Sequence, residues 1–441
     1  MVFSSIVFLF YFLPSVLFFY YIAPRKFKNL ILLIFSLIFY AWGEPIYILV
    51  MIFSAIVDYI HAIAIDKYRY NVKSKIALIS SICINLGLLI FLKYTPLNLP
   101  LPIGISFYTF QTMSYSIDVY RNKVPVQKNL VSLATYITLF PQLVAGPIVR
   151  YLDISTQLDF RDTNLDKFHY GIYRFIIGLS KKILLANNLG IIWNNIKVIP
   201  HSELSLLTSW LGIICFSLQI YFDFLGYSDM AIGLGNMFGF SFPENFNFPY
   251  ISKSVTEFWR RWHISLGVWF RDYVYIPLGG NRCSKPRWLL NIFIVWFLTG
   301  LWHGPTFNFI LWGLYFGVIL TIEKLYMLEV LNKFPDILKH IYTLLIVLVS
   351  FVIFESTDTF ELINYLKAMF INSNLIDKTF IYYLIPNLTL LLISILGCTP
   401  LIKKLIDKHD FLRFVFLTSG LILSTSFLVD SSFNPFLYFR F

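Results

Sequence analysis

The sequence has few charged residues for its length, and this shortage argues against a soluble fold. Asp, Glu, Lys and Arg make up 13% of the 441 residues, whereas soluble domains carry about 25%. Hydrophobic residues reach 58%, and the mean hydropathy is +0.70. The apolar runs are continuous and do not alternate with polar residues, which disfavours a β-barrel. The composition therefore predicts an all-α polytopic membrane protein.

Cysteine is also scarce, and its spacing fits neither a zinc site nor a redox pair. The four cysteines are Cys83, Cys215, Cys283 and Cys398. They lie far apart, mostly within apolar runs, and no CxxC spacing occurs. The glycines between 233 and 239 match neither a phosphate loop nor a dinucleotide fingerprint, because no strand precedes them and their spacing is wrong. We therefore expect no metal site, and we attribute these glycines to close helix packing.

The charges that are present sum to +11, which in a soluble protein would suggest nucleic acid as a partner. Here the basic residues gather in short loops, as they do at the cytoplasmic ends of membrane helices. We therefore expect membrane lipid around the chain and no nucleic acid. The basic loops at 25–28 and 67–75 enclose two apolar segments, so both should face the cytoplasm. The N-terminus and the turn at 93–102 should then lie outside.

Apolar segments suited to membrane helices recur along the whole chain. They fall at 2–22, 29–43, 46–65, 75–92, 103–119, 130–146, 169–190, 205–223, 227–240, 288–303, 306–325, 338–354, 380–397 and 412–429. Because a span needs about 20 apolar residues, we expect about 11 full spans together with short or re-entrant helices. The first segment lacks a basic leader, so we interpret it as a retained span. No repeat or soluble segment appears, so residues 1–441 should form a single integral-membrane domain.

Several polar or broken stretches interrupt these segments. Proline and glycine break the run at 135–151, which predicts either a kinked helix or irregular backbone that is buried or lines a cavity. Asp223 and Asp229 lie in apolar sequence, where a carboxylate is costly unless it is paired or hydrated. We expect structural ion pairs for them, with a polar tunnel as the alternative. For Lys182, in another apolar run, the simplest expectation is that it snorkels to an interface.

The stretch 252–287 concentrates basic and aromatic residues. It contains seven Lys or Arg and two acids, a net charge of +5. A cytoplasmic loop would explain the charge, but tryptophans alternate with it, and Glu257 would reach Arg260 and Arg261 at helical spacing. We therefore predict an amphipathic, partly re-entrant helix with a cationic face. Turned inward, that face would suit a phosphorylated cofactor such as coenzyme A.

Two of the seven histidines, His263 and His303, lie 40 positions apart, and each adjoins a tryptophan. His303 lies in apolar sequence, where a histidine is either a satisfied core residue or a functional group. The second histidine, the basic stretch and the broken run favour function. A histidine that burial keeps neutral can act as general base on a hydroxyl. The other five histidines lie at segment edges or in loops, which is typical of interface positions.

Three internal motifs and the C-terminal residues form a recognisable pattern. The stretches are FPQLVAGPIVRY (140–151), SKSVTEFWRRWHISLGVWFRDYVYIPLGGNR (252–282), TGLWHGPTFNFILWGLYFG (299–317) and NPFLYFRF (434–441). With them the chain resembles the membrane-bound O-acyltransferase (MBOAT) superfamily, specifically its bacterial alginate O-acetyltransferase-like branch. The D-alanyl transfer proteins of teichoic acid modification share FWRRWH and WHG-type motifs, but the PLGGNR continuation favours the acetyltransferase branch.

This resemblance implies an MBOAT-type ring of helices around a central tunnel. An acyl group would pass from a cytoplasmic thioester toward an acceptor outside, with acetyl-CoA as a donor substrate and no permanently bound cofactor. His303 matches the characteristic histidine of the superfamily and would be the general base. His263 would orient or polarise the donor or help to relay the acyl group, and Arg260 and Arg261 would steer the donor phosphates.

The resemblance also implies a setting. The chain would lie in the bacterial cytoplasmic (inner) membrane and work with an extracytoplasmic SGNH or esterase-like acetyltransferase partner. The acceptor would be an exported, alginate-like polysaccharide or peptidoglycan. Three other functions stay open: D-alanyl-type transfer to teichoic acid, a transport or export channel without acyl chemistry, and a scaffold that anchors an extracytoplasmic synthase.

Overall fold

The computed structural model describes residues 1–95, 101–144 and 146–430, and every regular element in those ranges is helical. The all-α prediction is therefore confirmed for the described chain. The motif at 434–441 and residues 96–100 of the predicted outside turn lie beyond the described residues. The chain divides into two compact units. Unit 1 comprises Met1–Leu179 and Tyr227–Glu244, and unit 2 comprises Ser180–Gly226 and Asn245–Phe441.

Unit 1 is built from the N-terminal helices and the last part of one long helix. Its elements are η1 (Phe8–Phe12), α1 (Leu13–Ile22), η2 (Arg25–Phe27), α2 (Lys28–Ala41), α3 (Ile48–Lys67), α4 (Val72–Tyr94), α5 (Ile105–Tyr120), α6 (Leu130–Thr138), α7 (Phe140–Leu143), α8 (Tyr151–Asp159), nearly all of α9 (Leu165–Ser180) and the end of α11 (Leu206–Met237). Phenylalanine rings fill part of its interior, with Phe8 and Phe12 stacked at 5.5 Å between centroids.

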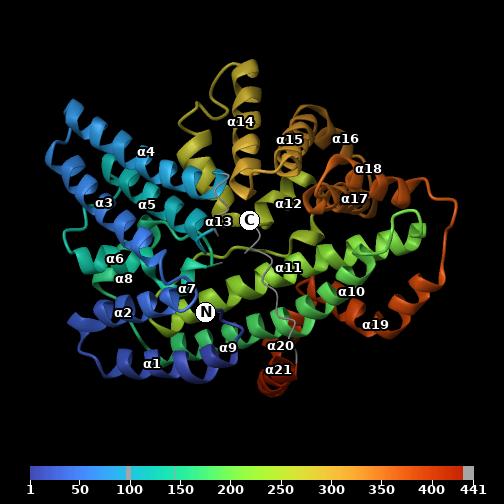
Figure 1. Ribbon diagram of the computed structural model, residues 1–441, viewed down its shortest axis with the longest axis horizontal. Coiled ribbons are helices and arrows are strands. Elements are labelled where there is room, and N and C mark those ends of the chain that lie inside the picture. The colour runs from blue at the N-terminus through green and yellow to red at the C-terminus, as the bar shows by residue number, and fades with distance from the viewer. Residues whose placement is uncertain (96–100, 145, 431–441) are drawn as a thin grey trace. The chain divides into compact units, whose positions relative to one another are not determined.

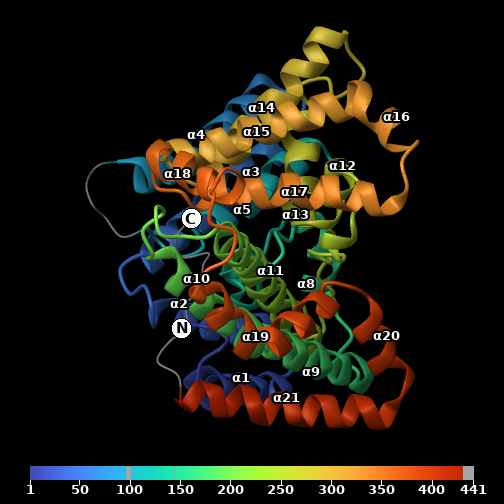
Figure 2. The ribbon, with the colours of Figure 1, turned by 90° about the vertical axis from the view of Figure 1, so that its right-hand side faces the viewer.

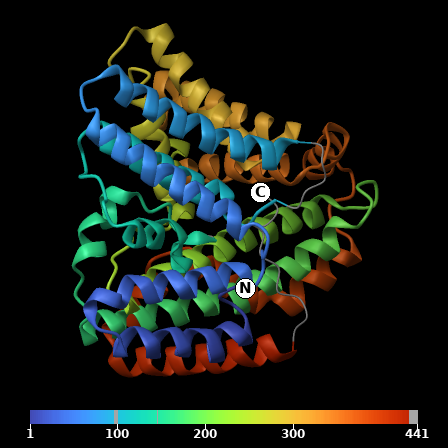
Figure 3. The same ribbon diagram turned by 60° about the vertical axis from the view of Figure 1, so that its left-hand side comes forward.

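Helices α3, α4 and α5 lie side by side in unit 1 (Figures 1 and 3) and share a buried polar cluster. Asp58 is fully buried, and its Oδ1 accepts hydrogen bonds from Ser81 Oγ at 2.6 Å and Ser116 Oγ at 3.0 Å. Its Oδ2 accepts from Asn85 Nδ2 at 2.9 Å. Since buried polar groups need partners, these bonds between helices stabilise the packing of otherwise apolar elements.

Unit 2 contains the remaining helices. They are η3 (Lys181–Ala186), α10 (Asn187–Lys197), the first part of α11, η4 (Pro249–Ile251), α12 (Val255–Arg261), α13 (Ile264–Phe270), η5 (Arg271–Tyr275), α14 (Lys285–His303), α15 (Phe307–Ile322), η6 (Glu323–Met327), α16 (Leu328–Leu331), α17 (Asp336–Glu355), α18 (Thr359–Phe370), α19 (Lys378–Gly397), α20 (Leu401–Lys408) and α21 (Asp410–Asp430). Figure 2 shows α14 and α15 running side by side. Trp302 and His303 of the WHG motif end α14, and Gly304 begins the turn to α15.

Seven stretches of described helix are long and apolar enough to cross a membrane. They are Ile48–Lys67, Val72–Tyr94, Leu165–Lys197, Leu206–Met237, Asp336–Glu355, Lys378–Gly397 and Asp410–Asp430. The chain is thus a multi-pass membrane protein. The count of about 11 spans stays a prediction, as does the outside position of the N-terminus. The predicted segments 288–303 and 306–325 form α14 and α15, which are not among the seven.

Two of the predicted boundaries are wrong. The segments 205–223 and 227–240 are joined in one continuous helix, α11, which ends at Met237, and 169–190 lies inside the 33-residue helix Leu165–Lys197. The two aspartates of α11, Asp223 and Asp229, are accommodated because each is paired with a cation, as described below. The glycine interpretation holds at Gly233, where an added Cβ would lie 2.6 Å from the Gly171 carbonyl oxygen. Only glycine allows α9 and α11 to approach so closely.

Candidate active site

His303 is the last residue of α14 and lies in a box of aromatic rings. Its ring centroid is 5.0 Å from Trp302 and 5.0 Å from Trp312 of α15. Phe354 of α17 is at 5.3 Å and Phe309 of α15 at 6.2 Å. The side chain is 6% exposed. The histidine that the sequence singled out is therefore buried, and three helices contribute to its surroundings.

His263 lies between α12 and α13, also buried, at 2% exposure. Its backbone is left-handed, with φ 45° and ψ 53°, a conformation that is uncommon for any residue with a Cβ. Its Nδ1 is 3.1 Å from Asn245 Oδ1. The ring meets Phe224 of α11 at 4.7 Å and Trp302 at 6.0 Å between centroids. Trp302 therefore borders both histidines, and unit 2 brings the two predicted site residues to the same indole ring.

The backbone at His263 contradicts the prediction of one amphipathic helix across this motif. Helix α12 ends at Arg261, and α13 begins at Ile264. An extended segment explains the break, because the Asn247 amide donates to the Arg261 carbonyl and the Ile264 amide donates to the Asn245 carbonyl, both at 2.9 Å. These long-range bonds replace the helical bonds that would have continued α12. The break turns the His263 side chain out of the helical register.

The tryptophans of this segment pack inward. Trp259 meets Trp296 at 4.8 Å, Trp312 at 5.6 Å and Phe316 at 4.9 Å between centroids. Since Trp312 also contacts His303, the aromatic residues of α12 extend the box around that histidine. Burial of such large rings makes a major contribution to packing.

The two predicted donor-binding arginines differ in their surroundings. Arg261 forms the predicted ion pair with Glu257 at 2.8 Å, and it also donates to the Asn247 carbonyl at 3.0 Å. Burial would raise the pKa of Glu257, but hydrogen bonds from the Lys253 amide and from Arg261 outweigh it and lower that pKa. The Arg261 charge is therefore balanced locally. Arg260 is exposed.

A further cation lies near Arg260. Burial, and then repulsion from Arg260, lower the pKa of Lys324 in η6. The Lys324 Nζ also lies over the Trp288 ring, 5.9 Å from its centroid. Lys324 is not among the site residues predicted from the sequence. Arg260 in the last turn of α12 and Lys324 of η6 are thus two cations close enough to repel each other.

Glu323 and Asn245 are two more residues that sequence reasoning missed. Glu323 is fully buried and accepts hydrogen bonds from the amides of Val255 and Thr256, both at 2.7 Å, and from Thr256 Oγ1 at 2.6 Å. It thus holds the N-terminus of α12, where a negative charge is favourable. Neither residue belongs to a local pattern, because each acts on a segment distant in sequence.

The charges within apolar helices are paired, as predicted for the aspartates. In unit 2, Lys182 Nζ is 2.6 Å from Asp223 Oδ1, and the two side chains are 1% and 2% exposed. In unit 1, Arg174 is 2.6 Å from both Asp229 Oδ1 and Glu244 Oε2. The expectation that Lys182 snorkels to an interface is wrong, because its buried carboxylate partner keeps it inside the unit.

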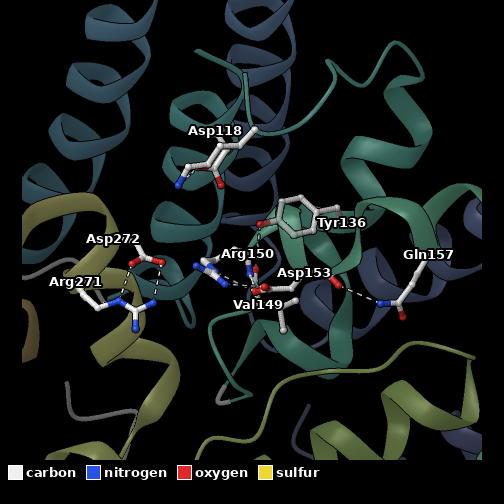
Figure 4. Close-up of polar contacts among 9 residues, drawn as sticks. Asp118, Tyr136, Val149, Arg150, Asp153, Gln157, Arg271 and Asp272 are labelled. Atoms are coloured by element: carbon white, nitrogen blue, oxygen red, sulfur yellow. Dashed lines mark hydrogen bonds and ion pairs between the residues drawn. The ribbon is translucent and has the colours of Figure 1, made fainter. Parts of the chain in front are cut away.

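The described residues of the broken run, 135–144 and 146–151, are almost all buried, and the run is divided rather than kinked. Helix α6 ends at Thr138, and α7 begins at Phe140. Tyr136 Oη donates to the Val149 carbonyl at 3.0 Å, and Arg150 pairs with Asp153 at 2.8 Å (Figure 4). The Val149 carbonyl is thereby satisfied, and the Arg150 amide donates to Asp153 Oδ2 at 3.0 Å, so both backbone groups have partners inside unit 1. The kinked-helix alternative is therefore wrong.

Comparison with known proteins places these motifs in context. A model of the MBOAT, membrane-bound O-acyltransferase family, matches residues 71–355. A protein of Pseudomonas aeruginosa named probable alginate O-acetylase AlgI is 40% identical over 393 residues, which cover 84% of this chain and 75% of that protein. A peptidoglycan O-acetyltransferase of Helicobacter pylori is 31% identical, covering 100% of this chain and 98% of that protein. A teichoic acid D-alanyltransferase of Bacillus subtilis is 31% identical over 59% of this chain and 70% of that protein.

Proposed function

Because the chain belongs to the membrane-bound O-acyltransferase family, we propose that it transfers acetyl groups to an exported glycan. The donor would be a cytoplasmic thioester, acetyl-CoA, and the acceptor an alginate-like polysaccharide or peptidoglycan. The names of the relatives that cover most of the chain support both acceptors. The observation that carries the proposal is the position of His263 and His303, which both border Trp302.

In this proposal His303 is the general base. It accepts the proton of the acceptor hydroxyl, and the oxygen forms an ester bond to the acyl carbon of the thioester. The carbon–sulfur bond breaks, and the departing thiolate takes up the proton. The aromatic box supports this role, because exclusion of water keeps an imidazole neutral and able to accept a proton.

His263 orients or polarises the donor or helps to relay the acyl group. It lies outside the seven candidate spans, and burial lowers its pKa to about 3, so its ring is neutral. Arg260 and Arg261 are proposed to attract the donor phosphates. Arg260 is the more available of the two, because Glu257 already balances Arg261, and Lys324 adds a second cation beside it.

The wider setting is also part of the proposal. The chain would act as one integral-membrane domain in the bacterial inner membrane, with its N-terminus outside and its helices arranged as a ring around a tunnel. The immediate acceptor would be a hydroxyl of an extracytoplasmic SGNH or esterase-like partner, with the glycan modified afterwards. The seven candidate spans and the family support the membrane location.

A D-alanyl donor is the second candidate, since the teichoic acid D-alanyltransferase of Bacillus subtilis matches part of the chain. The acetyl-transferring relatives cover more of it. A transport channel or a scaffold would need neither histidine for chemistry. Purified protein in proteoliposomes, supplied with radiolabelled acetyl-CoA and the acceptor, separates these functions.

The test compares His303→Ala and His263→Ala with His409→Ala, which replaces an exposed histidine between α20 and α21. Glycan O-acetylation should fall at least about 100-fold for His303→Ala, the size expected when a general base is removed. His409→Ala should match the unsubstituted protein. Normal acetylation by well-expressed His303→Ala would refute the catalytic role, and normal acetylation by both site variants would favour a scaffold.

A further inference from the structure

Asn245 holds the loop that carries His263 at four points. The residue is fully buried. Its backbone carbonyl accepts the Ile264 amide at 2.9 Å. Its side-chain Oδ1 accepts Ser265 Oγ at 2.8 Å and the Ser265 amide at 3.3 Å, and it lies 3.1 Å from His263 Nδ1. One asparagine thus contacts three consecutive residues from 18 to 20 positions away.

These contacts determine which nitrogen of His263 carries the proton. A backbone amide can only donate, so the Asn245 atom that faces the Ser265 amide is the oxygen and not the NH₂ group. That oxygen has no hydrogen to offer to His263. The Nδ1 of His263 must therefore donate, and in a neutral ring the proton is then on Nδ1 while Nε2 keeps its lone pair.

The backbone conformation of His263 is a second observation that supports a functional role for the contact between Asn245 and His263. Its φ of 45° lies in the left-handed region, which persists in residues with a Cβ only where the surroundings impose it. The hydrogen bonds that Asn245 accepts from Ile264 and Ser265 hold the two residues that follow His263. Such strain occurs often at functional sites, where it fixes the direction of a side chain.

We propose that Asn245 is a positioning residue that fixes His263 in its Nδ1–H tautomer, so that Nε2 acts as the acceptor toward substrate. This inference rests on the proposed function for its chemical meaning, but not for its geometry. It narrows the role of His263, because a neutral Nδ1–H imidazole has no proton on Nε2 with which to polarise the donor carbonyl. His263 then works by accepting a hydrogen bond or a proton through Nε2.

The direct test is ¹⁵N NMR of the full chain in lipid nanodiscs, with ring-labelled histidine and a pH at which histidine is neutral. His263→Gln identifies the signals among the seven histidines. The unsubstituted protein should show a protonated Nδ1 and an unprotonated Nε2 at His263. A proton on Nε2 would overturn the proposal, and this measurement requires no Asn245 variant to fold.

Variants of Asn245 then test whether this residue sets the His263 tautomer. Asn245→Leu removes the acceptor and should move the proton to Nε2, with a fall in kcat for acetyl transfer of about 10-fold to 100-fold. Asn245→Asp keeps an oxygen at the same position and should keep the Nδ1–H tautomer and recover part of the activity. An unchanged tautomer in folded Asn245→Leu would show that Asn245 does not set it.

A matched control separates positioning from stability. Asn291 is another fully buried asparagine of unit 2, and its Nδ2 donates to the Gly280 carbonyl at 3.1 Å. Asn291→Leu should lower thermal stability but leave the His263 tautomer as it is, whereas a tautomer change in Asn291→Leu would point to a non-specific effect. Because the tautomer is measured without turnover, failure of acetyl transfer to depend on His303 would refute the proposed function and leave this inference standing.

Discussion

Replacement of Glu323 should release the N-terminus of α12 and disturb the segment that leads to His263. Its carboxylate accepts three hydrogen bonds from Val255 and Thr256. Val255 is fully buried, so its amide has no water to replace the lost acceptor, whereas Thr256 is partly exposed. An unsatisfied buried donor costs about 1–3 kcal/mol, and a bond to a charged group contributes about 1.5–3 kcal/mol.

Bonds that share one carboxylate are not additive, so we expect Glu323→Ala to lower the free energy of unfolding by about 3 kcal/mol. Glu323→Gln keeps one oxygen but turns an NH₂ group toward a donor, and about 2 kcal/mol is expected. For a folding unit of roughly 150–250 residues, each kcal/mol corresponds to about 2–4 °C in Tm. Acetyl transfer should fall at least about 10-fold, because small displacements of positioned groups reduce rates strongly.

The assay combines thermal unfolding in detergent with acetyl transfer in proteoliposomes. Glu361 supplies a matched control, since its Oε2 accepts the Thr357 amide at 2.6 Å and Thr357 Oγ1 at 2.7 Å at the exposed start of α18. Glu361→Ala should cost only about 0.5 kcal/mol, as expected at the surface. If Glu323→Ala is no less stable and no less active than Glu361→Ala, the anchoring role of Glu323 is refuted.

Two further predictions concern packing and pH. An added Cβ at Gly313 would lie 2.3 Å from the Trp296 carbonyl oxygen, so Gly313→Ala should separate α14 from α15 and lower both Tm and activity. An added Cβ at Gly267 would have nothing within 4 Å, so Gly267→Ala should leave Tm unchanged. Equal Tm values for the two variants would contradict this prediction. Burial raises the pKa of Asp377, but hydrogen bonds, the largest from Thr208, outweigh it, so the pKa lies below its ordinary 3.8. The stability from this carboxylate is complete above that ordinary value and is lost as pH falls through the lowered pKa. The unsubstituted protein should therefore have a higher Tm than Asp377→Asn by a constant amount near neutral pH, and this difference should disappear on acidification. A difference that persists at low pH would contradict the lowered pKa of Asp377.

The helical class and most segment positions could be predicted because they depend on local hydrophobicity. The segment 338–354, for example, corresponds to α17 within a few residues. Continuity through polar residues could not be predicted. Asp223 suggested a helix end, yet α11 continues, because Lys182 supplies a cation from 41 positions away. A carboxylate in apolar sequence indicates that a partner exists but does not identify which one.

In the candidate site, too, features that depend on local sequence could be predicted, and features that depend on distant partners could not. His303 was found from its apolar context and its motif, both of which are visible locally. The break at His263 was missed because regular i+3 and i+4 spacing favoured a continuous helix. What interrupts that helix is a pair of backbone bonds to Asn245 and Asn247, and no local pattern in either segment indicates that they will pair.

The two histidines have different surroundings, and the roles proposed for them differ accordingly. Four aromatic rings surround His303, and in the proposed function this residue accepts the proton of the acceptor hydroxyl. His263 instead has the Asn245 oxygen 3.1 Å from its Nδ1, and the proposal gives its Nε2 the role of acceptor toward substrate. Because Trp302 contacts both rings, displacement of either histidine would shift Trp302 and thereby the other histidine. The pair should therefore behave as one unit, and a double substitution should reduce acetyl transfer little more than His303→Ala alone.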